Sequence, residues 1–177
     1  MTRTAAAVLA ALVALACAAP IRTQVLTPDP PSGVTKVALV PLRTDPLAYD
    51  VPESAPHLVT ARIASALESE TKLRVVDAGK ADAVLTGTVR RFVERDGTST
   101  GVRHPASVWI VLELRDQAGN PLWNGTYEET QPALSEDAGS FPRAWERGFR
   151  WVTAEDLASY GARELVRELA REVATWS

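Results

Sequence analysis

Few side chains in this 177-residue chain have the types and spacing that chemistry needs. The sequence holds one cysteine, Cys17, and two histidines, His57 and His104, which lie far apart beside prolines. One cysteine excludes an internal disulfide and a cysteine-based zinc cage, and isolated histidines in loop-like positions favour neither catalysis nor metal binding. Glu128 and Glu129 are adjacent in an expected strand, so they point to opposite faces and do not form an acid–base pair. No glycine-rich phosphate loop is present. The sequence therefore predicts no enzyme, no cofactor and no metal site.

The start of the chain predicts a modification instead. The run from Ala5 to Ala16 contains only Ala, Val and Leu, and Arg3 is the only charge before it. A dozen apolar residues match the hydrophobic region of a signal peptide, whereas a membrane-spanning helix needs roughly 20. The ending Val13 to Cys17 resembles a bacterial lipobox, in which the cysteine is lipidated and becomes the new N-terminus. Residues 1–16 are thus expected to be a signal peptide, and Cys17 is expected to be the lipidation site.

Two other interpretations of this segment stay open. The sequence Ala14-Leu15-Ala16 also fits release into the periplasm by ordinary cleavage, and the segment could equally be an anchor that is never cleaved. No Asp follows Cys17, which by resemblance to the common sorting rule implies the outer membrane, with the protein facing the periplasm. Residues 17–35 are rich in proline and are expected to be a lipidated tether, with a loop wrapped around the domain as the alternative.

The rest of the chain has the composition of a folded domain. It is 46% hydrophobic and 23% charged overall, with a net charge of −3. This mix supports a buried core, and the absence of a basic surplus argues against nucleic-acid binding. Residues 36–177 are expected to form a single α+β domain.

Hydrophobic periodicity predicts the order of elements βα-ββββ-α. A mixed four- to five-stranded sheet with two helices packed on one face would satisfy this order. Thr153 is expected to cap the final helix, and the strand around residues 108–114 is expected to be central because it is the most hydrophobic. The expected strands are 36–42, 73–76, 83–94, 108–114 and 122–130, and the expected helices are 56–70 and the segment after residue 153.

Two helices leave one sheet face to explain. Aromatic side chains mixed with polar ones are typical of contact surfaces, which predicts an interaction face. The alternative is that residues 131–153, which include Trp145 and Trp151, fold back and bury these rings. The candidate interaction residues are Phe92, Trp109, Val111, Trp123 and Tyr127.

The runs Val37 to Leu42 and Ala81 to Val89, with a Gly- and Trp-containing hairpin at 119–123, resemble a group of small bacterial envelope lipoproteins. The group includes the lipopolysaccharide-assembly lipoprotein LptE and relatives similar to the small domains of CsgG and TolB and to the exopolysaccharide lipoprotein PelC. The resemblance covers roughly residues 36–177. It implies a non-catalytic accessory or assembly component of an envelope transport or export machine, similar to lipopolysaccharide assembly. The membrane would be a partner through the N-terminal lipid, and an envelope protein would be another.

Three alternative functions stay open at this point. One is a homo-oligomeric exporter ring. Another is a lipoprotein that binds lipid or glycan in a groove lined by Trp109, Trp123, Trp145 and Trp151. The third is a purely structural envelope protein.

Overall fold

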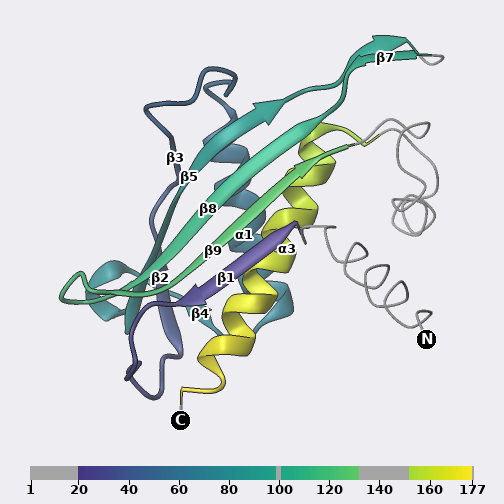
Figure 1. The fold of residues 1–177 in the computed structure, drawn as a ribbon. Helices are drawn as coiled ribbons and strands as arrows, with labels where there is room; N and C mark the ends of the chain where they lie inside the picture. Colours follow the sequence, from purple (N-terminus) through teal and green to yellow (C-terminus); the bar gives the residue numbers. More distant parts are fainter. Residues whose placement is uncertain (1–19, 99–100, 132–151, 177) are drawn as a thin grey trace, which may run out of the picture.

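A computed structural model describes residues 20–98, 101–131 and 152–176 (Figure 1). The signal peptide, Cys17 and the aromatic segment with Trp145 and Trp151 lie outside the described residues. The helices are α1 (Ala55–Glu70) and α3 (Ala154–Val173), with a short 3-10 helix η2 (Ala78–Lys80). The strands are β1 (Ile21–Val25), β2 (Lys36–Leu39), β3 (Arg43–Thr44), β4 (Arg74–Val75), β5 (Ala83–Val93), β6 (Asp96–Thr98), β7 (Gly101–His104), β8 (Ser107–Asp116) and β9 (Pro121–Thr130).

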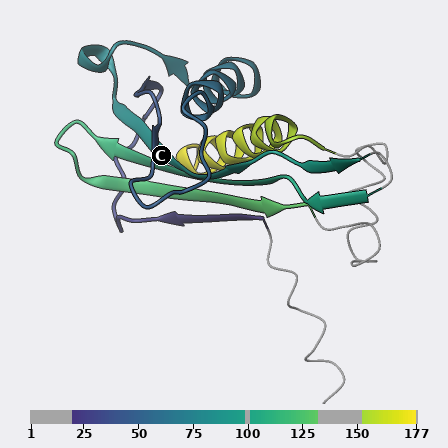
Figure 2. The same cartoon turned by 90° about the horizontal axis from the view of Figure 1, so that it is seen from above.

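The strands build one mixed seven-stranded sheet in the order β1-β9-β8-β5-β2-β4, with β3 also paired to β5. The helices lie together on one side of the sheet, as Figure 2 shows from above. The predicted α+β class and the central position of β8 are confirmed. The predicted count of four to five strands was too low, because β1 lies in a proline-rich segment and β3 has only two residues.

Strand β1 corrects the prediction of a free tether over residues 17–35. Residues Ile21 to Val25 pair antiparallel with β9, so that Ile21 lies opposite Tyr127 and Val25 opposite Trp123. Ile21 and Val25 are half-buried while Arg22 between them is exposed, which is the period-two alternation of an edge strand. The nearby prolines hid this pattern, and part of the predicted tether belongs to the sheet.

The final helix α3 begins where its sequence predicts. The Thr153 side chain accepts a hydrogen bond from the backbone N–H of Asp156, and the Asp156 side chain accepts one from the backbone N–H of Thr153. This reciprocal capping box satisfies two N–H groups that the helix would otherwise leave without partners. The predicted Thr153 cap is confirmed.

The helices also pack against each other. Arg62 of α1 pairs with Glu155 of α3, and Arg167 of α3 pairs with Glu70 of α1 at 2.7 Å. The hydrogen bonds that the Arg167 guanidinium donates to the Glu70 carboxylate raise the pKa of Arg167. These pairs are exposed to solvent, so they orient the helices more than they stabilise them.

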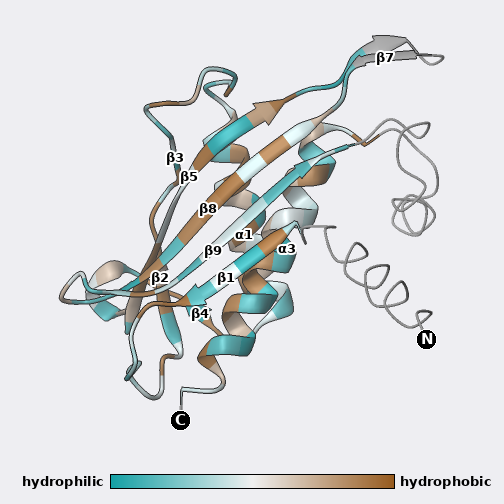
Figure 3. Cartoon of the chain, in the orientation of Figure 1, coloured by the Kyte–Doolittle hydropathy of each residue, from teal (hydrophilic) through white to brown (hydrophobic). Residues whose placement is uncertain are grey.

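The core lies between the helices and the inner face of the sheet. Along β8, Val108, Ile110, Leu112 and Leu114 have no exposed surface, while the residues between them are half-buried on the other face. Figure 3 shows the resulting alternation of hydrophobic and hydrophilic segments along the strands. Helix α3 approaches β9 closely at Gly161, because a Cβ there would lie 2.7 Å from Cγ of Tyr127.

The β8–β9 hairpin turns at the predicted residues. Gly119 has φ +90°, a conformation that side chains other than hydrogen disfavour. Asp116 accepts hydrogen bonds from the side-chain amide and the backbone N–H of Asn120, at 2.7 and 2.8 Å. These bonds favour the carboxylate and hold the pKa of Asp116 below its usual value.

Strands β6 and β7 pair antiparallel with each other as a separate two-stranded ribbon. Among the described residues, no helix has the length and hydropathy needed to cross a membrane.

Candidate functional site

The structure divides the predicted interaction face between the two sides of the sheet. Trp123 and Tyr127 have no exposed surface, and Phe92 is only 9% exposed, because all three belong to the core under the helices. Trp109 and Val111 are half-buried on the opposite side. The prediction that these five residues share one surface was therefore wrong.

A bulge in β5 explains the position of Phe92. The register between β5 and β8 shifts between Val89 and Arg91, so Phe92 pairs with Val108 and joins the buried set. Strict alternation from Thr88 would have placed Phe92 outside. Such a bulge leaves no reliable signal in the sequence.

On β9 the prediction placed Trp123 and Tyr127 on the wrong side of the sheet. Trp123 pairs with Leu114 and Tyr127 pairs with Ile110, both of which are buried. The Tyr127 hydroxyl donates to Glu129 at 2.6 Å, which lets a polar atom accompany the buried ring.

The side of the sheet away from the helices, called here the open face, is mainly polar. Around Trp109 and Val111 it presents an ion pair between Arg115 and Glu113 at 2.8 Å. No described helix covers it (Figure 2). The other side chains on this face come from three strands: Thr86 and Thr88 of β5, Asn124, Thr126 and Glu128 of β9, and Arg22 and Gln24 of β1.

Trp109 is the base of a layered contact at one end of the open face. The Arg90 guanidinium lies 5.0 Å from the centroid of the Trp109 ring, and Arg90 Nε donates to Asp45 Oδ2 at 2.8 Å. A cation over an indole face is attractive, and the Asp45 carboxylate holds the cation there. The Trp109 Nε1 atom is enclosed and has no described hydrogen-bond partner.

This contact supports an exposed loop, called here the Tyr49 loop (residues 45–50). The Asp45 N–H donates to the Val89 carbonyl at 3.0 Å and the Phe92 N–H donates to the Asp50 carbonyl at 3.2 Å, so β5 holds the loop at both ends. Between them, Tyr49 is 93% exposed and Leu47 is 79% exposed. A hollow of about 360 Å³ lies beside the loop and is also lined by Arg90, Arg91 and Trp109.

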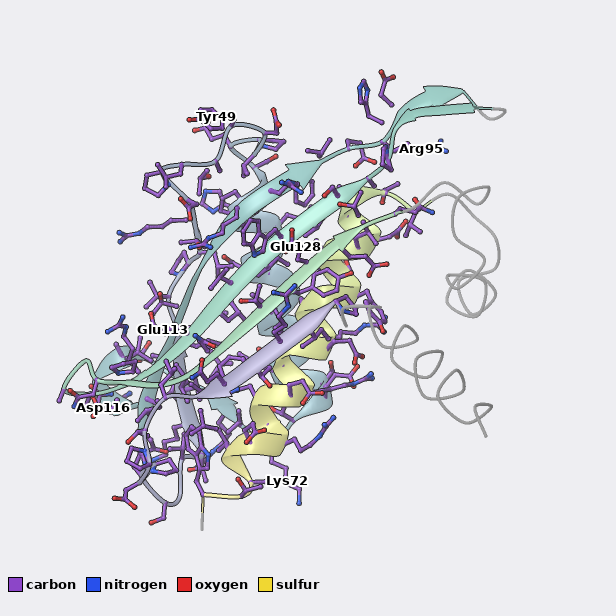
Figure 4. The ribbon with its side chains drawn as sticks, in the orientation of Figure 1. Tyr49, Lys72, Arg95, Glu113, Asp116 and Glu128 are labelled. Carbon is purple, nitrogen blue, oxygen red and sulfur yellow. The ribbon has the colours of Figure 1, made fainter. Side chains whose placement is uncertain are left out.

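A larger hollow lies at the C-terminal ends of both helices and is called here the C-terminal groove. Its volume is about 750 Å³. Its apolar floor is formed by side chains that are each less than 10% exposed, and its rim carries Lys72 and Arg171. The floor residues are Val34, Leu73, Val173 and Trp176. Figure 4 labels Tyr49 and Lys72, which lie at separate ends of the molecule.

Neither the Tyr49 loop nor the C-terminal groove was predicted from the sequence. The loop carried a signal, since two large apolar residues lie between Pro46 and Pro52 in a segment without strand or helix periodicity. The groove carried none, because its residues come from three segments far apart in the chain.

The ionisable residues form no metal site within the described ranges. No group of three His, Cys, Asp or Glu side chains gathers there. His104 Nδ1 lies 3.8 Å from Asp96 Oδ2, and both side chains are exposed. The absence of an enzyme activity and of a cofactor stays a prediction.

Asp82 has a structural role at the start of the sheet. Its Oδ2 accepts hydrogen bonds from the backbone N–H groups of Thr35 and Lys36, at 2.9 and 2.8 Å. These bonds hold the pKa of Asp82 below its usual value. The Ala-Asp-Ala sequence that contributed to the family resemblance thus fixes the entry of β2.

Comparisons with known proteins give a fold and no family. No family model matches the chain, and no curated protein matches it. Two dodecamer structures of PelC from Paraburkholderia phytofirmans match with TM-scores of 0.58 and 0.57, at 18% and 20% identity. Each match covers 85% of this chain and 95–96% of that one. A protein from Xanthomonas campestris has 14% identity and a TM-score of 0.48 over 84% of this chain and 89% of its own.

The chain therefore has the fold of PelC, one of the proteins that its sequence resembles. At this level of identity the likeness shows the fold alone. No match to LptE or CsgG is among these structures.

Proposed function

We propose that the protein is a non-catalytic lipoprotein of a bacterial envelope that works by assembling with copies of itself as part of an export machine. The observation that carries the proposal is the fold, which the chain shares over 85% of its length with PelC, a protein whose structures are dodecamers. The Tyr49 loop supports it, because exposed large apolar side chains on a soluble domain mark sites of protein contact.

The proposal places the protein at the outer membrane, facing the periplasm, with the lipid on Cys17. Three residues separate Cys17 from Ile21, the first residue of β1, so the chain makes four residue steps between them. Since an extended chain spans at most about 3.6 Å per residue, the lipid attaches within about 14 Å of the sheet. A second acyl chain makes such an anchor durable. The short connection holds the domain against the membrane, where copies meet in one plane.

Of the functions that the sequence leaves open, self-assembly favours the homo-oligomeric exporter ring over an accessory component similar to lipopolysaccharide assembly. A ring component needs contacts with its own copies, whereas an accessory component needs contact with a different envelope protein.

The test has two measurements on the full chain expressed in a bacterium. Membrane fractionation should find the wild-type protein in the outer membrane and a Cys17→Ser variant released into the soluble periplasm. Native mass spectrometry of the lipidated protein in detergent should give a multiple of the chain mass. A monomer at all concentrations, or a serine variant that stays fully in the membrane, would remove the basis of the proposal.

A ligand-binding lipoprotein is the second candidate, and one observation favours it. The hollow of about 360 Å³ beside Trp109 combines aromatic, cationic and carboxylate side chains, which suits a polar ligand with an apolar body such as a glycan unit. Native mass spectrometry after incubation with envelope glycans would show an added mass, lost in a Trp109→Ala variant, if this candidate holds.

A further inference from the structure

The chain carries two surface features that neither the fold nor the anchor explains: the protruding Tyr49 loop and the C-terminal groove. We propose that the Tyr49 loop of one copy docks into the C-terminal groove of the next copy, and that this contact builds the assembly. The inference rests on the self-assembly proposed above and names its interface.

The Tyr49 loop has the properties of an anchor. Its two apolar side chains, Leu47 and Tyr49, are the most exposed large hydrophobic residues in the described part of the chain. Tyrosine is enriched among residues that dominate binding energies, because it buries a large area at a low entropic cost. Exposure of two such side chains on one short loop favours burial against a partner.

The loop is also held in place by contacts within its own chain. The Leu47 N–H donates to Asp45 Oδ1 at 2.9 Å, and the Ala48 N–H donates to the Asp45 carbonyl at 2.9 Å. Asp45 is in turn held by Arg90, which lies on Trp109. A preorganised loop loses less conformational freedom on docking, so more of its contact energy appears as affinity. This gives Trp109 a role as the support of the loop.

The C-terminal groove offers a complementary surface. Its volume of about 750 Å³ has room for several side chains, and its floor is apolar. Val34 and Trp176 form part of this floor, and each residue is 5% exposed. Burial of a tyrosine and a leucine there would remove apolar area from water on both partners.

The loop segment and the groove rim carry charges of opposite sign, although Glu70, which is paired with Arg167, also lines the groove and Arg91 lines the hollow beside the loop. Asp50 lies in the loop and Glu53 lies just beyond it, whereas Lys72 and Arg171 stand on the groove rim. Asp50, Glu53 and Lys72 have no ion pair within the described residues, although Arg171 is paired with Glu168 at 3.0 Å. Opposite charges across an interface steer the encounter and fix the register of docking.

The position of the features makes the contact intermolecular. Tyr49 and Lys72 lie at separate ends of the molecule (Figure 4), so a loop cannot reach the groove of its own chain. A contact between two different patches is heterologous, and such contacts propagate until they close a ring or continue as a filament. A second copy is therefore the occupant that both features fit together.

Two single variants test the contact. Tyr49→Ser removes the anchor at a site that is almost fully exposed, and Ala174→Trp fills the groove from an exposed position. Each variant of the lipidated full chain should keep the wild-type circular dichroism and lose self-association on the order of 30-fold, the effect of one strong anchor residue. Leu26→Ser, which changes another exposed apolar residue outside both features, is the matched control and should keep the wild-type mass.

Mixing the two variants gives the decisive result. The Tyr49→Ser chain retains an intact groove and the Ala174→Trp chain retains an intact loop, so a mixture can form one good contact per pair. Native mass spectrometry should then show a dimer with one chain of each kind and no larger ring. If the single variants assemble like the wild type, or if the mixture forms no mixed dimer, the proposed interface is wrong while self-assembly stands. A wild-type chain that is monomeric would instead refute the proposed function.

A charge exchange provides an independent check. Asp50→Lys and Lys72→Asp should each weaken assembly several-fold, and the chain that carries both should recover it. If the double variant is weaker than either single variant, these two residues do not face each other across the interface.

Discussion

The close approach of α3 to β9 leads to a prediction about Gly161. Replacement of a helical glycine by alanine normally stabilises a helix by about 1 kcal/mol. Here the new Cβ would lie 2.7 Å from Cγ of Tyr127 and closer still to two other carbons of the ring. That ring has no exposed surface, and it lies 6.2 Å from the ring of Tyr160, so it has little room to move.

Overpacking of a core costs about 1–3 kcal/mol, and a clash with several atoms of a fixed ring belongs at the upper end. The expected net effect of Gly161→Ala is a loss of about 2 kcal/mol in the free energy of unfolding. For a chain of this size, that lowers the melting temperature by about 4–8 °C. Urea unfolding followed by circular dichroism would measure the free energy, and a thermal melt would measure the melting temperature.

The same substitution in a variant without the Tyr127 ring tests whether this ring causes the loss. In a Tyr127→Leu chain the ring is gone, so adding Gly161→Ala should no longer destabilise and should stabilise by up to about 1 kcal/mol. The effect of one substitution thus changes sign with the presence of one ring. If Gly161→Ala is neutral or stabilising in the wild-type background, contact with Tyr127 does not set the distance between helix and sheet.

Three further predictions concern single contacts. Asp82→Asn should lower the stability by about 1 kcal/mol at pH 7, because it weakens two hydrogen bonds at the start of β2. Folding lowers the pKa of Asp82 from its ordinary value of 3.8. This contribution to stability is therefore present above pH 3.8 and is lost as the pH falls through the pKa of the folded state. Urea titrations at several pH values should show the stabilities of wild type and variant converge as the carboxylate becomes protonated. Trp123→Ala should lower the free energy of unfolding by about 3–5 kcal/mol, whereas Trp109→Ala should leave a folded chain with a much smaller loss of stability. Equal melting temperatures for the two variants would contradict the assignment of these residues to opposite sides of the sheet. Thr153→Ala should cost about 1 kcal/mol by removing the cap of α3, and Thr153→Ser should restore most of it.

The sequence was sufficient to predict the helices and strands whose hydrophobic pattern repeats over many residues. Helix α1 was expected at 56–70 and spans Ala55–Glu70, and β9 was expected at 122–130 and spans Pro121–Thr130. These segments repeat their pattern over many residues, so neighbouring residues support the same assignment. The turn at Gly119 was predictable because its conformation restricts the residue type.

The arrangement of side chains was harder to predict. The bulge before Phe92 reverses the side of the sheet that this residue faces, and it depends on how the loop after β3 pairs with β5. For Trp123 and Tyr127, both sides of β9 offered plausible core residues, and only the packing of α3 decides between them. The Tyr49 loop and the C-terminal groove could not be predicted for a similar reason, since the exposure of Tyr49 and the meeting of the groove residues both depend on tertiary structure.

The pairing of β1 with β9 has a practical consequence for anyone who shortens the chain. A version that starts at Lys36, the first residue of the domain expected from sequence, would lack β1 and leave the backbone N–H and C=O groups of β9 unpaired along a five-residue register. A bare strand of this kind is a template for adding a strand from another molecule, so such a protein should aggregate in a way that a version starting at Ala18 does not. Solubility after expression would therefore report on the strand directly, without any functional assay.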